Sequence, residues 1–528
     1  MHPSALAKRL YILLFSAVVA FYFYGLGNLP LLGPDEPRYA QVAREMFLRG
    51  DFVTPTLGGH TWFEKPALLY WLMMASFRIF GVSEFSARVG PALCGLLTIA
   101  AVWFVARAVE RDSNKANGFA FWTALVAASS LGLIVFSRAA SFDVVITMTT
   151  AWALALFVRS EIDTTKRSAL LLGFYIFVGL SLLAKGLVGI VVPFGVLGFY
   201  YVFRRRWPNR QVWRSLIWGV PLALAVSAIW YGPVIARHGW TFIEEFFIQH
   251  HFARYVSNKY HHPQPLYFYP TIILLLALPW TAFLIDALVK VRRWAWRGED
   301  SMSIVRVFSL AWLLLPIIFF SFSGSKLPAY ILPSLPAVAF LVGDRLVHSE
   351  SRWPMRATAV MCLALAGGGF VYGVRSGAIT VACATLIAVP VVIAAVVSFF
   401  RREAAMVLGV ATFVLVLIVL RCAAPPVAKR ESVRDLLRLA DARGYANAPV
   451  LAPRSDDRTA QFYAYDRVIY NAQGEPITFD EITLEAARTL GPRIVVLIPV
   501  RYVEDFRGAS RIEIIGDNGR IAVLGWTP

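Results

Sequence analysis

Charged side chains in this sequence gather in short segments beside long apolar runs, where ionisable groups are costly and usually functional. Two such segments are GPDEPR at 33–38, with Asp35, Glu36 and Arg38, and FEKP at 63–66, with Glu64 and Lys65. The Arg38 fork could grip a phosphate and Lys65 could neutralise a phosphate leaving group, while a carboxylate could act as a base or bind a metal. Structural roles remain open, because Asp35 or Glu36 could cap a helix and Glu64 could pair with Lys65 in a loop.

Four more polar side chains stand almost alone among apolar residues. Asp143 opens an apolar run, where it is either a helix cap or an acidic group of a site. Lys185 has no acidic neighbour in the sequence, so it either extends to the membrane interface or meets an acid such as Asp143 or an anionic lipid head. Lys326 and Tyr330 lie in a turn, GSKLPAYILP at 324–333, which is punctuated by Gly and Pro.

Two pairs of neighbouring histidines, at 250–251 and 261–262, flank Arg254 in a loop rich in Tyr and Pro. Imidazole together with a carboxylate is a ligand set that suits zinc. The histidine pairs make His250 and His251 candidate ligands for a divalent metal, zinc or similar, although the spacing matches no zinc signature. Glu64 is a separate candidate ligand in its own segment. We expect no nucleotide cofactor, since the sequence has no P-loop and no glycine-rich turn of the GxGxxG type.

The composition of the whole chain indicates a membrane protein. Of 528 residues, 58% are apolar and 16% charged, against roughly 45–50% and 25% in soluble domains, and the mean hydropathy is +0.60. A soluble enzyme, a disordered chain and a fibrous protein are thereby excluded. The four cysteines lie in apolar runs, so we expect free core thiols and no disulfide framework: Cys94, Cys362, Cys383 and Cys422.

Thirteen apolar runs are candidates for membrane spans, which need about 20 residues each. They lie near 10–27, 86–106, 117–136, 143–158, 168–183, 187–203, 214–236, 267–289, 304–322, 329–347, 357–373, 378–399 and 404–423. We interpret the first as a retained signal-anchor.

The net charge of +18 indicates how the spans are oriented. The tail after residue 428 has 14 basic and 14 acidic residues, so the whole excess belongs to the rest of the chain. Basic residues concentrate in alternate loops, which predicts a cytoplasmic amino terminus and an outer carboxyl tail. The charged candidate residues then all fall on the outer side.

Two segments of the first outer loop, 28–85, differ from spans. Residues 37–49 form an amphipathic pattern with Tyr39, Val42, Ala43, Met46 and Phe47 on one face, and residues 66–80 are apolar but short. We expect interfacial helices in both places. A second outer loop covers 237–266, and residues 1–428 form the transmembrane domain.

The tail, 429–528, is predicted to be a small α/β domain. It combines an amphipathic helix at 432–443 and a helix near 483–490 with short β-like runs at 448–452, 461–465, 467–471, 493–499 and 511–525. An outward-facing site has no ready nucleotide supply, so the substrate must arrive in the membrane. A phosphate-linked lipid fits the cations and the apolar surroundings.

Several motifs resemble the C-type, multi-span glycosyltransferases, above all the lipid A aminoarabinose transferases and the wider protein-mannosyltransferase-like group. They occur in family order over about residues 10–340 as PDEPRYAQVAREM, GDFVTP, FEKPALLYW, SFD, LLAKGLVGIVVP, QHHFARY and GSKLPAYILP. The resemblance implies thirteen spans, a periplasmic active site and a polyprenyl-phosphate-linked sugar donor. It also implies roles for individual residues: Asp35 as the essential acid, Asp143 as a second acid, Arg38, Lys65 and Tyr330 at the lipid phosphate, and Glu64 and His250 at a metal.

We therefore expect a polytopic α-helical membrane protein of the bacterial inner membrane that transfers a sugar with inversion from undecaprenyl phosphate to lipid A or a related envelope acceptor. The sugar could be 4-amino-4-deoxy-L-arabinose. The alternatives are a protein O-mannosyltransferase-like enzyme, a transferase for another envelope glycan and, less favoured, a lipid-linked sugar transporter, which would need charges near the midplane and repeat symmetry. We expect a monomer that binds no nucleic acid. Asp35, Glu36 and Asp143 are the catalytic candidates, and the phosphate candidates are Arg38, Lys65, Tyr330, Lys185, Lys326 and Arg254.

Overall fold

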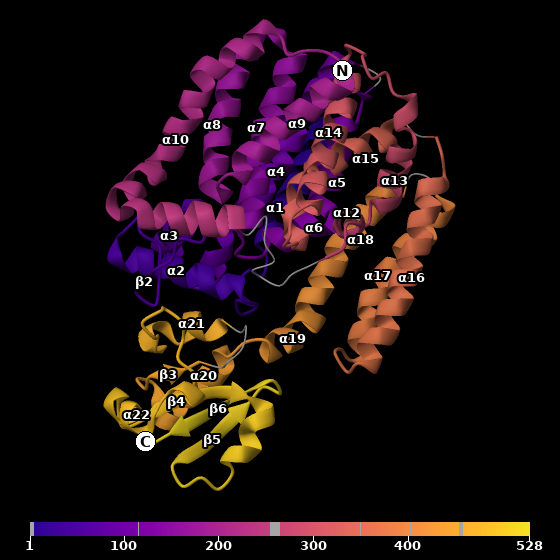
Figure 1. The fold of residues 1–528 in the computed structure, drawn as a ribbon. Coiled ribbons are helices and arrows are strands. Elements are labelled where there is room, and N and C mark those ends of the chain that lie inside the picture. The colour runs from indigo at the N-terminus through magenta and orange to yellow at the C-terminus, as the bar shows by residue number, and fades with distance from the viewer. Residues whose placement is uncertain (1–4, 114–115, 254–263, 349, 402–403, 453–457) are drawn as a thin grey trace.

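The computed structural model describes residues 5–113, 116–253, 264–348, 350–401, 404–452 and 458–528. Long helices form a bundle, and a smaller domain with a sheet lies beyond one end of it (Figure 1). Between the two lie the short helices α2 (Asp35–Arg49) and α3 (Leu68–Phe80) and the hairpin of β1 (Thr56–Leu57) and β2 (His60–Thr61). The predicted fold class is confirmed: a polytopic helical membrane protein with a small C-terminal domain.

Within the described ranges, nine helices are long and apolar enough to cross a membrane, some together with adjoining 3-10 or π turns. They are α4 (Glu84–Asp112), α7 (Phe142–Ile162), α8 (Arg167–Lys185), α10 (Arg210–Phe242), α14 (Ser301–Ser321), α15 (Leu335–His348), α16 (Trp353–Arg375), α17 (Val381–Phe400) and α18 (Ala405–Ile418). Together, α5 (Phe119–Ser129) and α6 (Leu131–Ser137) have the length and apolar composition of a span, and they meet at a bend of 57°, as in a broken span or a re-entrant loop.

The three remaining spans of the predicted thirteen correspond to shorter or broken helices. They are α1 (Ala5–Phe23), α9 (Val188–Arg204) and the pair α12 (Phe268–Leu276) and α13 (Thr281–Val289). The last pair is interrupted around Pro279, whose nitrogen has no hydrogen to donate to a continuous helix. The count of thirteen stays a prediction.

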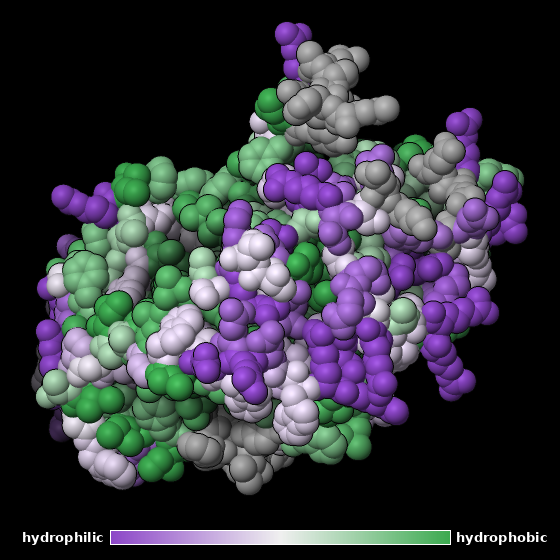
Figure 2. Space-filling model, turned by 90° about the horizontal axis from the view of Figure 1, so that it is seen from above, coloured by the Kyte–Doolittle hydropathy of each residue, from purple (hydrophilic) through white to green (hydrophobic). Residues whose placement is uncertain are grey.

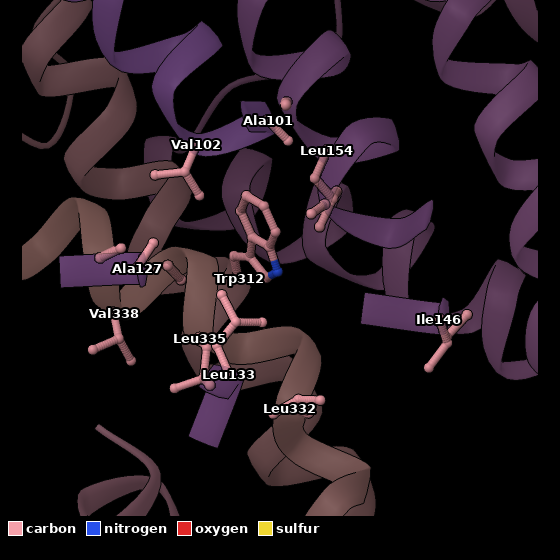
Figure 3. Close-up of a cluster of buried hydrophobic side chains, with 14 of the residues drawn as sticks. Ala101, Val102, Ala127, Leu133, Ile146, Leu154, Trp312, Leu332, Leu335 and Val338 are labelled. Atoms are coloured by element: carbon pink, nitrogen blue, oxygen red, sulfur yellow. The ribbon is translucent and has the colours of Figure 1, made fainter. Parts of the chain in front are cut away.

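Apolar side chains from several helices fill the centre of the bundle (Figure 3). Trp312 of α14 is almost completely buried among them, and its indole N–H donates to the carbonyl of Pro333 at 2.7 Å. Pro333 belongs to the 3-10 segment η5 (Pro328–Ser334), which takes up the second part of the predicted turn at 324–333. The core thus fixes the segment that carries Tyr330.

The amphipathic prediction for 37–49 is confirmed for the apolar face of α2. Tyr39, Val42, Ala43 and Met46 are buried against the bundle. An interfacial helix would expose its opposite face to solvent. Here α21 (Thr459–Tyr463) of the C-terminal domain packs on that face and buries Arg44. The helix therefore lies between two protein layers.

The C-terminal domain has a four-stranded sheet in the order β3-β4-β6-β5. The strands are β3 (Val450–Leu451), β4 (Ile494–Pro499), β5 (Ile512–Asp517) and β6 (Ile521–Trp526), with β3 parallel to β4 and the other pairs antiparallel. Helices α20 (Arg434–Ala440) and α22 (Leu484–Leu490) agree with the predicted helical segments. The predicted strand at 461–465 was wrong, since this segment belongs mainly to α21, which is held by its contacts with α2.

The expectation of four free thiols is also wrong. Cys383, near the start of α17, and Cys422, in the π turn η6 (Val419–Ala423) after α18, form a disulfide with their Cα atoms 5.8 Å apart. The two helix ends meet, although 39 residues separate them in the sequence. Cys94 and Cys362 are free and buried, as expected.

Candidate functional site

The first turn of α2 places Asp35 and Arg38 side by side. The helix begins at Asp35 directly after Pro34, so the two side chains are three positions apart and lie on one face. The guanidinium Nη2 donates to Oδ1 of Asp35 at 2.7 Å. The same guanidinium lies over the ring of Trp62, 5.1 Å from its centroid, and near that of Tyr39, at 5.5 Å. An Arg held between aromatic rings is already positioned for a ligand.

Glu64 and Lys65 join this pair from the segment before α3. Glu64 Oε2 lies 3.6 Å from Arg38 Nη2, and Lys65 Nζ donates to Glu64 Oε1 at 3.0 Å. Burial opposes the charge of Arg38, but the carboxylates of Glu64 and Asp35 outweigh it and hold the pKa of Arg38 above its ordinary value. The two predicted clusters therefore form one group of two acids and two cations, which we name the loop cluster: Asp35, Arg38, Glu64 and Lys65.

Arg38 keeps unused hydrogen-bonding capacity inside the loop cluster. Its Nε–H is buried and has no acceptor among the described residues. A buried donor without an acceptor is costly, which makes it a natural contact for an anion.

Glu36, a catalytic candidate, points away from the loop cluster. Arg88 of α4 holds it with two hydrogen bonds, from Nε at 2.9 Å and Nη2 at 2.8 Å. The backbone N–H groups of Leu32 and Ala140 donate to the same carboxylate at 2.9 and 2.7 Å. Arg88 also donates to the carbonyls of residues 26, 29 and 30. With both oxygens occupied and largely buried, Glu36 fastens the start of α2 to α4 and Ala140.

Asp143 and Lys185 form a second pair, at the amino end of α7 and the carboxyl end of α8. Lys185 Nζ donates to Asp143 Oδ1, and the Ser141 hydroxyl donates to Oδ2 at 2.9 Å. Ser141 also caps α7 by accepting from the Asp143 N–H at 3.1 Å. Of the roles open for Lys185, the structure thus selects the ion pair with Asp143.

The second pair lies close to Tyr330 and to the loop cluster. Lys185 Nζ lies 4.7 Å from the centroid of the Tyr330 ring, and Lys65 is near enough to Asp143 to act on it electrostatically. Four segments far apart in the sequence therefore converge at the end of the bundle nearest the C-terminal domain.

Lys326 is directed to a different partner. Its ammonium donates to the carbonyl of Gln264 at 2.9 Å, and the side chain is buried. This contact ties the turn before η5 to the end of the second outer loop. Arg254 lies outside the described residues, and so do the side chains of His250 and His251, whose backbone belongs to the π-helical segment η3 (Ile243–Ala253).

Glu64 contacts two cations, and the side chains of His250 and His251 lie outside the described residues, so the predicted metal site stays a prediction. The two oxygens of Glu64 face Lys65 and Arg38, and a cation placed there would meet both positive charges at short range. Among the described residues, no three side chains of His, Cys, Asp or Glu are grouped as metal ligands.

Two residues with positional roles escaped the sequence analysis. Trp62 covers the guanidinium of Arg38, and Arg88 anchors Glu36. Trp62 stands immediately before the FEKP segment, so its position was a usable signal. Arg88 lies 52 residues from Glu36, and no local pattern could connect them.

The C-terminal domain touches the helix that carries the loop cluster. Arg44 of α2 donates to the carbonyl of Phe462 at 3.0 Å and lies over the rings of Phe462 and Tyr465, 4.9 and 4.3 Å from their centroids. Burial lowers the pKa of Arg44 to about 10, so it keeps its charge at neutral pH. The Tyr463 hydroxyl accepts from the Leu31 N–H at 2.7 Å and donates to Glu84 at 3.1 Å. The domain therefore supports α2 from the side opposite the bundle.

Comparison with known proteins gives matches that agree with this geometry. Residues 64–231 match the family described as dolichyl-phosphate-mannose-protein mannosyltransferase. An undecaprenyl phosphate-alpha-4-amino-4-deoxy-L-arabinose arabinosyl transferase of Pseudomonas aeruginosa is 32% identical over 349 residues, which cover 65% of this chain and 60% of the relative. The protein of the same description from Aeromonas salmonicida is 32% identical over 367 residues, covering 65% and 63%. The match thus spans less than two thirds of these relatives' length.

The fold is similar to that of solved structures over almost the whole chain. ArnT from Cupriavidus metallidurans bound to undecaprenyl phosphate has a TM-score of 0.78 at 24% identity, with 98% of each chain covered. The apo state of that protein has a TM-score of 0.75 at 21% identity, with the same coverage.

The helical membrane bundle, which has a cluster of cations and carboxylates at one end, thus has the fold of the ArnT structures. In sequence, the chain is similar to the undecaprenyl phosphate-aminoarabinose arabinosyl transferases, and residues 64–231 match the mannosyltransferase family.

Proposed function

We propose that the protein is an inverting glycosyltransferase that moves a sugar from a polyprenyl-phosphate donor to an acceptor of the cell envelope. The loop cluster carries this proposal, because it presents Arg38 and Lys65 together at the end of apolar helices. These two cations suit the phosphate of a lipid whose chain lies in the bilayer. The relatives described above are named for transfer of aminoarabinose from undecaprenyl phosphate, which supports this donor for the present chain.

In the proposed reaction an acceptor oxygen attacks the anomeric carbon of the sugar. A bond forms between that oxygen and the carbon as the bond from the carbon to the phosphate oxygen breaks. The electron pair of the broken bond stays on the phosphate, and Arg38 and Lys65 stabilise the charge that develops there. Because Glu64 holds Lys65 and faces Arg38, it keeps both cations in place when no phosphate is bound.

Asp35 is the proposed general base when the acceptor is a hydroxyl. Its side chain is 50% exposed, whereas that of Asp143 is 18% exposed and bonded to both Lys185 and Ser141. An exposed carboxylate next to the phosphate-binding Arg is the better placed of the two to accept a proton. A lipid A phosphate is already anionic and needs no strong base, so Asp35 would then mainly orient Arg38.

Asp143 is proposed as a second acidic group that acts through Lys185. The pair fixes the Lys185 ammonium 4.7 Å from the Tyr330 ring centroid. This arrangement places a third cation, together with a phenol, beside the loop cluster, where the sugar or the acceptor phosphate would lie. Lys326 is proposed to support this region through Gln264.

We propose no step through a metal, because Glu64 already faces two cations. We further propose that the site faces the periplasm in the bacterial inner membrane. The distribution of basic loops supports this orientation, and so does the disulfide between Cys383 and Cys422, because disulfides persist in oxidising compartments. A single chain carries all of the candidate groups, which supports activity as a monomer.

A protein acceptor is the second candidate function. It is favoured by the match of residues 64–231 to the mannosyltransferase family, which covers Glu64, Lys65, Asp143 and Lys185. Those residues would serve a phosphate-linked donor in the same way, so the two functions differ in the acceptor alone.

The experiment that tests the function compares the envelope of cells with and without the gene. In mass spectra, lipid A is expected to lose the mass of the transferred sugar in the deletion strain and to regain it when the gene is restored. An unchanged lipid A together with a loss of glycopeptides from periplasmic proteins would instead support the second candidate. If neither changes, and purified protein transfers no sugar from a polyprenyl-phosphate donor, the proposal is contradicted.

A further inference from the structure

A polar cavity lies at the end of the bundle opposite the candidate site. α7 runs from Asp143 at the site to Glu161, which bonds to Arg206, while Arg204 at the end of α9 donates to Glu299 at 2.8 Å. These contacts place residues 204–206 and 299 at the far end. There α13, the 3-10 segment η4 (Val291–Arg293), the start of α14 and the end of α15 enclose about 430 Å³, lined mainly by Lys290, Arg293, Trp294, Arg306, Asp344 and Arg345.

The carboxylates of this cavity hold its cations in fixed positions. Asp344 accepts two hydrogen bonds from Arg306, at 2.9 and 2.7 Å. Asp286 accepts from Arg345 at 2.7 Å and lies 3.1 Å from Lys290. Both carboxylates are at most 9% exposed, so the two pairs form a rigid wall that joins α13, α14 and α15.

Arg293 differs from the other cations of the cavity. It has no carboxylate within 4.0 Å among the described residues, whereas Lys290, Arg306 and Arg345 each have one. Four permanent cations thus face Asp286, Asp344 and the exposed Glu350, and the balance is positive, more so when His348 is protonated. An Arg fork that opens into a cavity without a carboxylate partner suits a phosphate, which it can bind with two hydrogen bonds.

The position of the cavity suits a lipid headgroup. Figure 2 looks onto this end of the molecule and shows hydrophilic residues gathered together, with apolar surface beside them. Trp294 and Trp296 lie partly buried next to the cavity, and Trp is enriched at the level of the headgroups. The predicted orientation places this end of the bundle on the cytoplasmic side of the membrane. Basic pockets between spans on that side bind anionic lipid headgroups.

We propose that the cavity binds the phosphate group of an anionic phospholipid, with Arg293 as its main contact and Lys290 and Arg306 beside it. Such a ligand would complete the charge balance at the ends of α13, α14 and α15. The inference does not depend on the transfer reaction, since it concerns the opposite end of the bundle.

The test uses the full-length protein, stripped of lipid in detergent and then placed in nanodiscs. The probes are phosphatidylglycerol in a phosphatidylcholine bilayer, phosphatidylcholine alone, and inorganic pyrophosphate in detergent. Native mass spectrometry measures the bound lipid, and the change in Tm measures the stabilisation that binding produces. Because Arg293 makes no ion pair within the described structure, Arg293→Ala is expected to keep the Tm that the wild type has without ligand.

The expected result is that Arg293→Ala weakens phosphatidylglycerol binding about ten- to hundredfold. Arg292→Ala is the matched control, because it removes the same charge from the neighbouring position, which does not line the cavity. Arg293→Lys keeps the charge without the fork and is expected to lie in between. Phosphatidylglycerol could give no stabilisation while Arg293→Ala still weakens the binding of pyrophosphate. The cavity would then bind the phosphate of a soluble anion, and the phospholipid would be ruled out as its ligand. Equal binding by Arg292→Ala and Arg293→Ala, or no binding by the wild type, would overturn the proposal.

Discussion

Replacing Glu36 with Gln separates a positioning role from a catalytic one. Glu36 receives two hydrogen bonds from Arg88 and two from backbone N–H groups, and its side chain is 12% exposed. Gln has the same size, but its amide nitrogen cannot accept a hydrogen bond. The amide nitrogen of Gln would therefore face one N–H of Arg88 and one backbone N–H, which are also donors. The charge of Arg88 would remain buried without a carboxylate partner.

The magnitude follows from this loss of a buried partner. Removing one member of a buried, hydrogen-bonded ion pair costs about 3–5 kcal/mol. Arg88 keeps its bonds to the carbonyls of residues 26, 29 and 30, which favours the lower half of that range. An exposed pair such as Arg507 with Glu504, each 68% exposed, contributes about 0–1 kcal/mol, so Arg507→Ala is the control.

The assay is denaturant unfolding of the purified protein in detergent, combined with turnover per folded molecule. Glu36→Gln is expected to lower stability by several kcal/mol and to raise KM for the lipid donor, because Asp35 and Arg38 start from the same helix turn. Wild-type stability together with a complete loss of kcat would refute the reasoning and would return Glu36 to the chemistry.

Three further predictions concern other parts of the structure. Arg44→Met removes the hydrogen bond to Phe462 and the ring contacts, so the C-terminal domain should become accessible to limited proteolysis; an unchanged digest would contradict its docking on α2. Denatured protein treated with a maleimide is expected to take up two labels without reductant and four with it, because Cys383 and Cys422 are paired, and four labels without reductant would disprove the disulfide. Treatment with EDTA is expected to leave turnover unchanged because Glu64 faces two cations, and a loss that Zn²⁺ restores would show that a metal is needed.

The parts of the fold that depend on local pattern could be predicted from the sequence. The apolar face of α2, nine or ten of the membrane helices and the helix α22 follow from periodicity and hydropathy. The segment 461–465 was mistaken for a strand because its four apolar and aromatic residues, which follow Gln461, suit either structure. Its contacts with Arg44 of α2, more than 400 positions away, are not visible in a local window.

The candidate site shows the same division between local and distant information. The pairing of Glu64 with Lys65 was among the alternatives that their adjacency suggested. Asp143 was likewise one of the alternatives for Lys185, which has no acidic neighbour in the sequence. The role of Glu36 could not be predicted in this way. Its partner Arg88 is 52 positions away, at the start of a span, and no local pattern marks it. The adjacent carboxylates therefore have different roles: Asp35 pairs with Arg38 in the loop cluster, whereas Glu36 pairs with Arg88 and fastens α2 to α4.

The most direct test of the central claim is sugar transfer by purified protein in proteoliposomes, with a polyprenyl-phosphate-linked sugar and lipid A as substrates. We predict that Lys65→Met and Asp35→Asn fold like the wild type and that Lys65→Met loses turnover about 10²- to 10⁴-fold. Asp35→Asn is expected to lose as much where a hydroxyl of lipid A is the acceptor, and less where a phosphate of lipid A is the acceptor. Arg507→Ala, at an exposed ion pair of the C-terminal domain, should keep wild-type turnover. Wild-type turnover by both Lys65→Met and Asp35→Asn would contradict the assignment of the site.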